Sequence, residues 1–256
     1  MAELEYGLST DKILGKVVEI FARRFNSQSE GRLLDIGSGN GTLVALLART
    51  SPNIKPNCVD YTDTLMVDKS IPLSIVDLNN EKLPFDNDVF DFISCTEVIE
   101  HLENYRFLIR EAYRVAKPGA TIVFTTPNVL NLNSRLRYLH YGFHSLFGPI
   151  DVNRVEAFST GGHITPIQYF YLAHAMLEAG YTNIKLEYDK KQSSSLAWLI
   201  FLYPIIWLTG LNTARREKNK KNINDSNKAI LTPTNTVGML LGRTIVVSAL
   251  KKSKVI

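Results

Sequence analysis

Residues 33–41 read LLDIGSGNG, in which three glycines at alternate positions directly follow a short apolar run. Glycine lets the backbone turn tightly and approach a ligand closely. The helix expected over residues 43–49 begins with N–H groups that have no partner within the helix. The stretch therefore predicts a strand, a nucleotide-binding turn and a helix. A dinucleotide fingerprint needs a further glycine where Thr42 stands, so an NAD-dependent dehydrogenase is disfavoured.

Short apolar stretches along the chain alternate with helical ones, and this alternation predicts a doubly wound α/β sheet. The helix expected over residues 105–116 ends at Lys117-Pro118-Gly119, because proline cannot continue the hydrogen-bond ladder of a helix. A second helix, over residues 166–179, is expected to end at Gly180. Strands are expected at residues 32–36, 56–60, 73–77, 90–95, 120–125, 183–188 and 243–250.

The composition is that of an ordinary globular protein, with 45% hydrophobic and 21% charged residues, which argues against a disordered or fibrous chain. A length of 256 residues fits one α/β domain with insertions. The two cysteines, Cys58 and Cys95, form neither a disulfide framework nor a CxxC pair. The first residues are polar and lack the apolar segment of a secretion signal, so the cytoplasm is the expected location.

The motif DIGSGNG resembles motif I of class I S-adenosylmethionine-dependent methyltransferases, and further matches follow in order across residues 33–125. The resemblance implies that S-adenosylmethionine is the cofactor. It also implies that Asp60 accepts hydrogen bonds from the ribose hydroxyls, and that Asp77 and Leu78, at the end of the third strand, meet the adenine. The expected cofactor-binding residues are Asp35, Gly37, Gly39, Gly41, Asp60, Asp77 and Leu78.

The expected architecture is a Rossmann-like, seven-stranded mixed sheet whose last strand is antiparallel, in a single methyltransferase domain over residues 1–256. Residues 33–125 form the cofactor-binding half. Residues 127–165 form an insert at the acceptor site, and residues 190–241 form an apolar and basic insert.

Glu97, Glu100 and His101 have the spacing i, i+3 and i+4, which places them on one face of a helix just beyond the fourth strand. Two carboxylates and an imidazole there can hold a divalent cation such as Mg²⁺. Alternatively, the two glutamates interact with the helix dipole, and His101 is packed or acts as a base.

The pattern also resembles quinone-biosynthesis O-methyltransferases and small-RNA 2′-hydroxyl methyltransferases, in which a later histidine completes a metal site. His163 offers that histidine here, so the resemblance implies a metal site of Glu97, Glu100, His101 and His163. If no metal is used, His101 or His163 is the expected catalytic base. A nucleic-acid acceptor is disfavoured, because no basic surface accompanies the site.

Residues 126–181 resemble, more loosely, methyltransferases encoded with bacterial surface-glycan pathways. The resemblance implies O-methylation of a small-molecule acceptor, namely a hydroxyl on a sugar, a lipid-linked glycan or a polyprenyl-type molecule. The alternative is a membrane-associated nucleotide-binding or assembly protein that has lost turnover. Measuring cofactor binding and methyl transfer separately distinguishes the two.

Residues 196–211 form an apolar run of sixteen residues that Pro204 interrupts. Because about 20 residues are needed to cross a bilayer as a helix, the run is not expected to span a membrane. Its aromatic residues and the basic residues up to Lys221 favour a peripheral, in-plane or re-entrant membrane contact through residues 196–221. The alternative is a buried hairpin that covers the edge of the sheet.

Overall fold

The computed structural model describes residues 11–151, 153 and 162–253. It contains a seven-stranded sheet with the order β3-β2-β1-β4-β5-β7-β6. Strands β1 to β5 are parallel, and β7 is antiparallel to both β5 and β6. The predicted seven-stranded mixed sheet with its antiparallel last strand is confirmed. The strands are β1 (Gly31–Ile36), β2 (Ile54–Asp60), β3 (Leu73–Ile75), β4 (Phe90–Thr96), β5 (Ala116–Pro127), β6 (Tyr181–Tyr188) and β7 (Thr244–Lys251).

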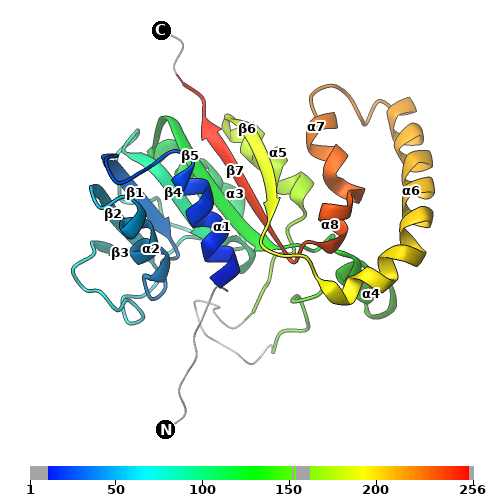
Figure 1. Ribbon diagram of the computed structural model, residues 1–256, viewed down its shortest axis with the longest axis horizontal. Coiled ribbons are helices and arrows are strands. Elements are labelled where there is room, and N and C mark those ends of the chain that lie inside the picture. The colour runs from blue at the N-terminus through cyan, green and yellow to red at the C-terminus, as the bar shows by residue number, and fades with distance from the viewer. Residues whose placement is uncertain (1–10, 152, 154–161, 254–256) are drawn as a thin grey trace.

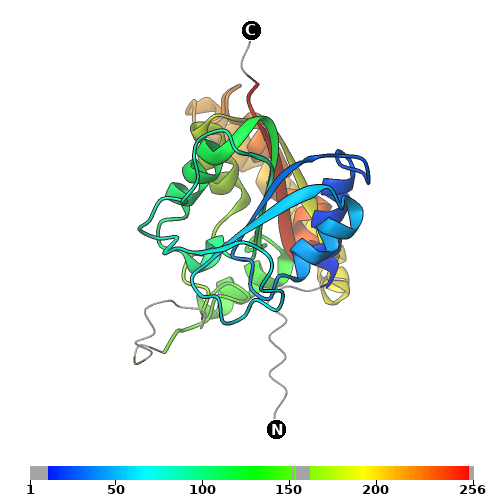
Figure 2. The same ribbon diagram turned by 90° about the vertical axis from the view of Figure 1, so that its left-hand side faces the viewer.

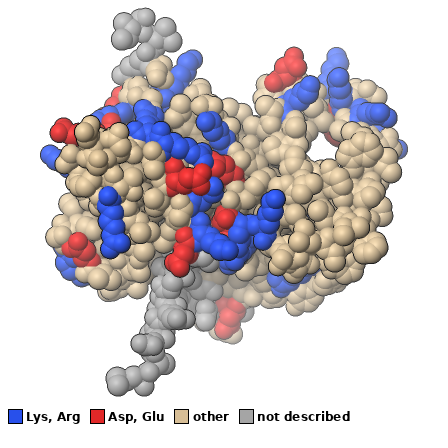
Figure 3. Space-filling view, viewed as in Figure 1, with Lys and Arg blue, Asp and Glu red and all other residues tan. Residues whose placement is uncertain are grey.

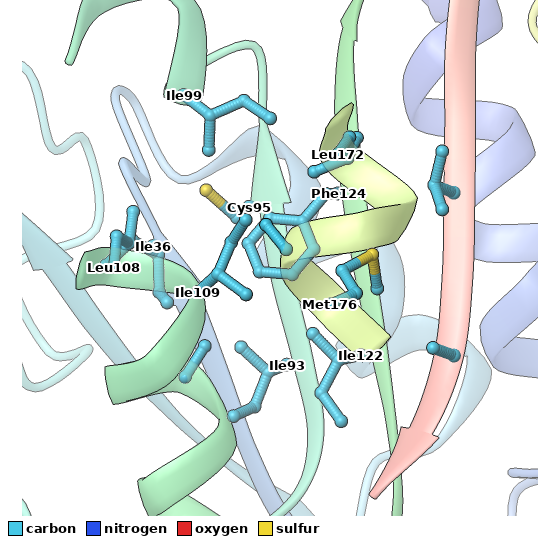
Figure 4. Close-up of a cluster of buried hydrophobic side chains, with 14 of the residues drawn as sticks. Ile36, Ile93, Cys95, Ile99, Leu108, Ile109, Ile122, Phe124, Leu172 and Met176 are labelled. Carbon is cyan, nitrogen blue, oxygen red and sulfur yellow. The ribbon is translucent and has the colours of Figure 1, made fainter. Parts of the chain in front are cut away.

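Helices cover both faces of this sheet (Figure 1), and the view turned by 90° shows the sheet between them (Figure 2). Helices α1 (Asp11–Ala22) and α2 (Thr42–Thr50) pack on one face, and α3 (Tyr105–Val115) and α5 (Tyr169–Ala179) pack on the other. Neighbouring strand residues alternate between the two cores, because successive side chains of a strand point to opposite faces. Phe92 and Val123 join the α1 side. Ile93 and Phe124 join the α3 side (Figure 4).

Several predicted boundaries differ from the structure. Strand β3 ends at Ile75, so Asp77 lies in the turn beyond the strand instead of closing it. Strand β5 begins at Ala116, directly after α3, because Ala116 already pairs with Phe90. Helix α5 begins at Tyr169, and it ends as expected at Gly180, whose φ of 103° is a left-handed conformation that favours glycine.

The two inserts add helices outside the sheet. The first contains α4 (Leu132–Tyr141), and part of the predicted insert 127–165 lies outside the described residues. The second contains η2 (Ser193–Ser195), α6 (Leu196–Asn219), α7 (Lys228–Leu231), η3 (Thr232–Asn235) and α8 (Val237–Leu241).

Helix α6 corrects two expectations about residues 196–211. Pro204 lies inside the helix and does not interrupt it; its missing N–H removes one backbone hydrogen bond, while the helix continues for 24 residues. None of the residues of α6 is buried, so the alternative of a buried hairpin is wrong. In the described part of the chain, the helical stretch Ser193–Asn219 alone is long and apolar enough to cross a membrane.

Candidate active site

A cavity of about 540 Å³ opens at the carboxyl ends of β1, β2 and β4. The chain runs outward from β1 through β2 to β3 and then returns to β4 on the other side of β1. The loops after β1 and β4 therefore diverge at this point, and such a switch point is where doubly wound sheets bind their ligands.

The glycine turn forms one wall of this cavity. Gly37, Gly39 and Gly41 have φ values of 71°, 52° and 83°, all in the left-handed region that favours glycine. A Cβ on Gly37 would lie 2.2 Å from Cγ2 of Val98, so no other residue fits there without a shift. Gly37 and Gly39 line the cavity, whereas Gly41 caps the start of α2 and does not line it.

Asp60 lies at the end of β2, where it is 4% exposed and lines the cavity. Its carboxylate accepts hydrogen bonds from the backbone N–H groups of Gly39, at 2.8 Å, and Tyr61, at 2.7 Å. Burial raises the pKa of Asp60, and the hydrogen bonds from backbone N–H groups oppose that rise. A carboxylate offers about four acceptor positions, so Asp60 can still accept bonds from a ligand diol.

Asp35 lies deeper in the same wall and is 2% exposed. The Ser94 hydroxyl, on the neighbouring strand β4, donates to its carboxylate at 2.7 Å. Burial raises the pKa of Asp35 to about 7, and the bond from Ser94 lowers it in part. The carboxyl group of Asp35 is therefore partly protonated near pH 7.

Asp77 and Leu78 line another part of the cavity, in the turn after β3. The Asp77 carboxylate accepts from the Asn79 backbone N–H at 3.0 Å and from the Asn80 side-chain amide at 2.8 Å. Sequence reasoning missed Asn79, which lines the cavity beside them, and also Leu14 of α1. The Asp and Asn residues at positions 77–80 are typical of a turn, so Asn79 could have been predicted there. Leu14 is one of several apolar residues in its helix, and no feature of the nearby sequence indicates that it lines the cavity.

Glu97 does not share a helical face with Glu100 and His101, so that prediction is wrong. Strand β4 ends at Thr96, Glu97 has a left-handed φ of 55°, and only the short 3₁₀ turn η1 (Ile99–His101) follows. The spacing of i and i+3 therefore does not put Glu97 and Glu100 on one helical face, although the charge of Glu97 is close enough to raise the pKa of Glu100. In the described part of the chain, the potential ligand atoms of Glu100, His101 and His163 lie within 4.8 Å of one another, and this group does not include Glu97.

Glu97 instead lines the cavity near Arg243. Its carboxylate accepts from the Thr125 hydroxyl at 2.9 Å, and the same hydroxyl accepts from the Glu97 backbone N–H at 3.0 Å. Burial raises the pKa of Glu97 to about 7, while the charge of Arg243 lowers it. A non-glycine residue in the left-handed region is held there by its surroundings, and such strain is frequent at functional sites.

Glu100 is fully buried, and within the described residues neither carboxylate oxygen has a hydrogen bond of good geometry, although the Thr126 hydroxyl is close enough to lower its pKa. Burial raises the pKa of Glu100 well above its usual range. Its backbone carbonyl accepts from the N–H groups of Ile164 and Thr165, both at 3.0 Å. These two bonds tie the segment that carries His163 to η1.

The rings of His101 and His163 lie edge to face with centroids 4.8 Å apart. Nδ1 of His101 is 3.0 Å from the carbonyl oxygen of Gly162, a contact that assigns the proton of a neutral ring to Nδ1. Burial and the neighbouring His101 lower the pKa of His163 to about 4. His163 is therefore neutral near pH 7 and can accept a proton or bind a cation.

Two further residues of this wall were not predicted. Leu146, from the acceptor-site insert, lines the cavity and is 50% exposed. Arg243 also lines it, and its backbone is fixed by bonds to the Lys190 carbonyl, at 3.1 Å, and from the Asn128 N–H, at 2.9 Å. Arg243 directly precedes β7, and its position at the cavity depends on the antiparallel pairing of β7 with β5.

A family model described as a methyltransferase domain matches residues 11–186. The chain is 27% identical over 111 residues to a ubiquinone/menaquinone biosynthesis C-methyltransferase of Desulfotalea psychrophila, which covers 40% of this chain and 44% of that protein. It is 30% identical over 112 residues to the mitochondrial ubiquinone biosynthesis O-methyltransferase of Rattus norvegicus, which covers 40% of this chain and 32% of that protein. The chain thus spans less than half the length of these relatives.

Solved structures show the same fold. An S-adenosylmethionine-dependent methyltransferase of Archaeoglobus fulgidus matches with a TM-score of 0.54 and 16% sequence identity, over 93% of this chain and 94% of that protein. This likeness concerns the fold alone, since fold does not by itself determine function.

Proposed function

Since the chain belongs to the methyltransferase-domain family, we propose that it binds S-adenosylmethionine in the cavity and methylates a hydroxyl group of a small-molecule acceptor. The observation that carries this proposal is that one cavity joins the glycine turn and Asp60 to the pair His101 and His163. The glycine turn and Asp60 suit the binding of a nucleoside, and the two histidines suit the activation of an acceptor hydroxyl.

The residues present fit the cofactor. The positive φ of Gly37 and the absence of a Cβ let the turn approach a ligand closely. Asp60 is buried and retains acceptor capacity for the two ribose hydroxyls. Asp77 and Leu78 line the same cavity, which supports their assignment to the adenine, and the buried carboxyl of Asp35 also lines it.

When bound, the cofactor supplies a sulfonium-activated methyl group. The acceptor oxygen forms a bond to the methyl carbon as the carbon–sulfur bond breaks, and the hydroxyl proton must leave to a base. His163 can take that role because its ring is neutral at physiological pH, but its pKa of about 4 makes it a weaker base than an ordinary histidine. The walls of the cavity contribute mainly by holding the two reactants in line.

A divalent cation is the alternative means of activating the acceptor. Glu100, His101 and His163 would hold it, and Glu97 would not, because it lies outside this group. The buried Glu100 oxygens without hydrogen bonds fit a cation, since a charge would offset their desolvation. One carboxylate and two imidazoles form a donor set that suits Zn²⁺, Fe²⁺ or Mn²⁺ at least as well as Mg²⁺.

The acceptor we propose is a sugar, a lipid-linked glycan or a polyprenyl-type molecule. His101, Glu97 and Arg243 line the cavity with polar groups that can orient hydroxyls, while Leu102 and Leu146 add apolar surface to it. The polyprenyl-type acceptor is supported further by the relatives named for ubiquinone and menaquinone biosynthesis.

Separate measurements of binding and transfer test the proposal. Calorimetry should detect S-adenosylmethionine binding, and incubation of lipid and glycan fractions with labelled cofactor should give a methylated product identified by mass spectrometry. Binding without any transfer would favour the assembly protein that has lost turnover. Absence of cofactor binding in folded protein would overturn the proposal. The cytoplasmic location stays a prediction.

A further inference from the structure

Helix α6 exposes an extended apolar surface. A soluble monomer rarely exposes a contiguous patch of this kind without a function. Figure 1 shows α6 at the outer edge of the molecule, with the rest of the fold on one side of it. Its exposed large apolar side chains, between 40% and 73% accessible, are Leu196, Trp198, Ile200, Phe201, Ile205, Trp207, Leu208 and Leu211.

The opposite side of α6 faces the rest of the fold. Its half-buried residues recur with helical spacing at Leu199, Leu202, Tyr203, Ile206 and Gly210. A Cβ on Gly210 would lie 2.7 Å from Nδ2 of Asn235 in η3, so the glycine permits close docking. The helix therefore contacts the fold on this side, at η2 and η3, and its outer face points away from the fold.

At about 100° per residue, Phe201 and Leu208 lie near the middle of this outer face. Trp198 and Trp207 are nine residues apart in the sequence, and so about 180° apart around the helix. Each tryptophan therefore lies at one border of the outer face, and each is about half exposed, at 52% and 51%. Tryptophan prefers the boundary between apolar and polar surroundings, which is where a helix lying in a membrane surface would place both rings.

The C-terminal end of α6 is basic. Arg215, Arg216 and Lys218 belong to its final turns, and Lys220 and Lys221 follow directly. Glu217 is the acidic residue among them, and it pairs with Lys220 at 3.0 Å. Figure 3 shows charged side chains gathered at the upper end of the right-hand part of the molecule, above a large uncharged surface. This combination is complementary to an apolar membrane interior bordered by anionic headgroups.

Helix α6 cannot span a bilayer in this fold, despite its length. Its 24 residues give about 36 Å, enough for a hydrocarbon core of roughly 30 Å. However, α7 begins at Lys228 and packs against α5, so the chain must return to the domain within residues 220–227. These residues reach at most about 28 Å when fully extended, whereas a return past the headgroups needs about 40 Å.

From the unpartnered apolar face, its bordering tryptophans and the adjoining basic residues, we propose that α6 lies flat in the surface of an anionic phospholipid bilayer. Phe201 and Leu208 enter the acyl region, and the basic segment 215–221 contacts headgroups. This surface is separate from the cofactor cavity, so bilayer binding does not require methyl transfer. It would bring a lipid-linked acceptor to the enzyme.

Tryptophan fluorescence of the full chain tests this directly, because both tryptophans of the sequence lie on α6. With vesicles of phosphatidylglycerol and phosphatidylcholine in equal parts, the emission should shift to the blue, and the protein should co-sediment. Pure phosphatidylcholine should bind less protein. Lipids brominated near the headgroup should quench both tryptophans, each measured in a variant with the other changed to Phe. Deep quenching of one tryptophan and shallow quenching of the other would indicate a spanning helix and overturn the proposal.

The double variant F201E/L208E should bind mixed vesicles roughly 100-fold more weakly, because two large apolar side chains no longer enter the bilayer. Changing Arg215, Arg216, Lys218, Lys220 and Lys221 to Gln should weaken binding by about fivefold per residue at low salt. The matched control is Ile75→Glu, which changes a 62% exposed side chain on the distant strand β3 and should bind as the unchanged protein does.

Two results would overturn the proposal. One is that the unchanged protein stays in the supernatant at low salt with mixed vesicles. The other is a stable dimer in ultracentrifugation that F201E/L208E dissociates, since a second copy would then cover the face. Circular dichroism of each variant establishes that it is folded, so neither result can be attributed to unfolding.

Discussion

The imidazole rings of His101 and His163 lie edge to face, with their planes at 77° and their centroids 4.8 Å apart. The backbone carbonyl of Glu100 holds the two segments together through bonds from Ile164 and Thr165. The ring of His101 is also held by its contact with the Gly162 carbonyl, whereas His163 is held through its backbone segment. The two imidazoles are thus kept side by side in the wall of the cavity.

Replacing His163 with Ala should lower the rate of methyl transfer by roughly 10²- to 10⁴-fold if it is the base. Affinity for S-adenosylmethionine should stay nearly unchanged, because the cofactor residues lie on other loops. The matched control is His174→Ala, which removes an exposed histidine on α5 and should leave the rate unchanged. Full activity of a folded His163→Ala protein would exclude this histidine from catalysis.

Chelation distinguishes a metal from a base. If Glu100, His101 and His163 hold a cation, extensively chelated protein should lose methyl transfer and recover it when a divalent ion is added. The variant Glu100→Gln should then need a much higher ion concentration while binding the cofactor normally. A full rate of methyl transfer after chelation would exclude the metal mechanism and retain the base mechanism.

Replacing Asp60 with Ala should weaken S-adenosylmethionine binding by about 1.5–3 kcal/mol, because hydrogen bonds from the ribose to a charged acceptor are lost. Asp60→Asn keeps the size and one acceptor oxygen, so its loss should be smaller. Calorimetry on folded protein measures both. Unchanged affinity in Asp60→Ala would remove Asp60 from the ribose site.

Gly37→Ala should destabilise the fold by roughly 1–2 kcal/mol from the left-handed conformation alone. The new Cβ would also meet Cγ2 of Val98 at 2.2 Å, which adds to this cost. Thermal unfolding measures the loss. Adding Val98→Ala should restore part of the stability, since it removes the contact but not the backbone strain; no recovery would mean that Val98 is not the obstacle.

Asp35 should make the cofactor-free fold less stable as the pH rises. Its pKa is raised from 3.8 to about 7 by burial, so between these values the unfolded chain has released a proton that the folded chain keeps. The folded state then binds more protons, and stability falls with increasing pH over this window. Asp35→Asn removes the effect. The difference in melting temperature between variant and unchanged protein should therefore grow from pH 4 to pH 7, and a constant difference would contradict the raised pKa.

Much of the cofactor half was determined by the sequence itself. Alternating glycines after an apolar strand specify a turn wherever they occur, because their φ values exclude most other residues. Alternation of strands and helices specifies the doubly wound sheet, and the acids Asp35 and Asp60 are placed by their positions near strand ends. These features depend on nearby residues, so they can be predicted without knowledge of the rest of the chain.

The tertiary structure decided the remainder. The spacing of Glu97 and Glu100 predicted a shared helical face, but Glu97 has a left-handed backbone conformation after β4 and lies outside the turn η1. The bonds of Glu97 to Thr125 on β5 fix this conformation. Likewise, α6 is apolar on nearly all sides, so its sequence cannot show which side packs. Docking at Gly210 and the short return to α7 decide that one face stays outside. Contacts between distant segments determine such features, because only the folded path of the chain brings these residues together.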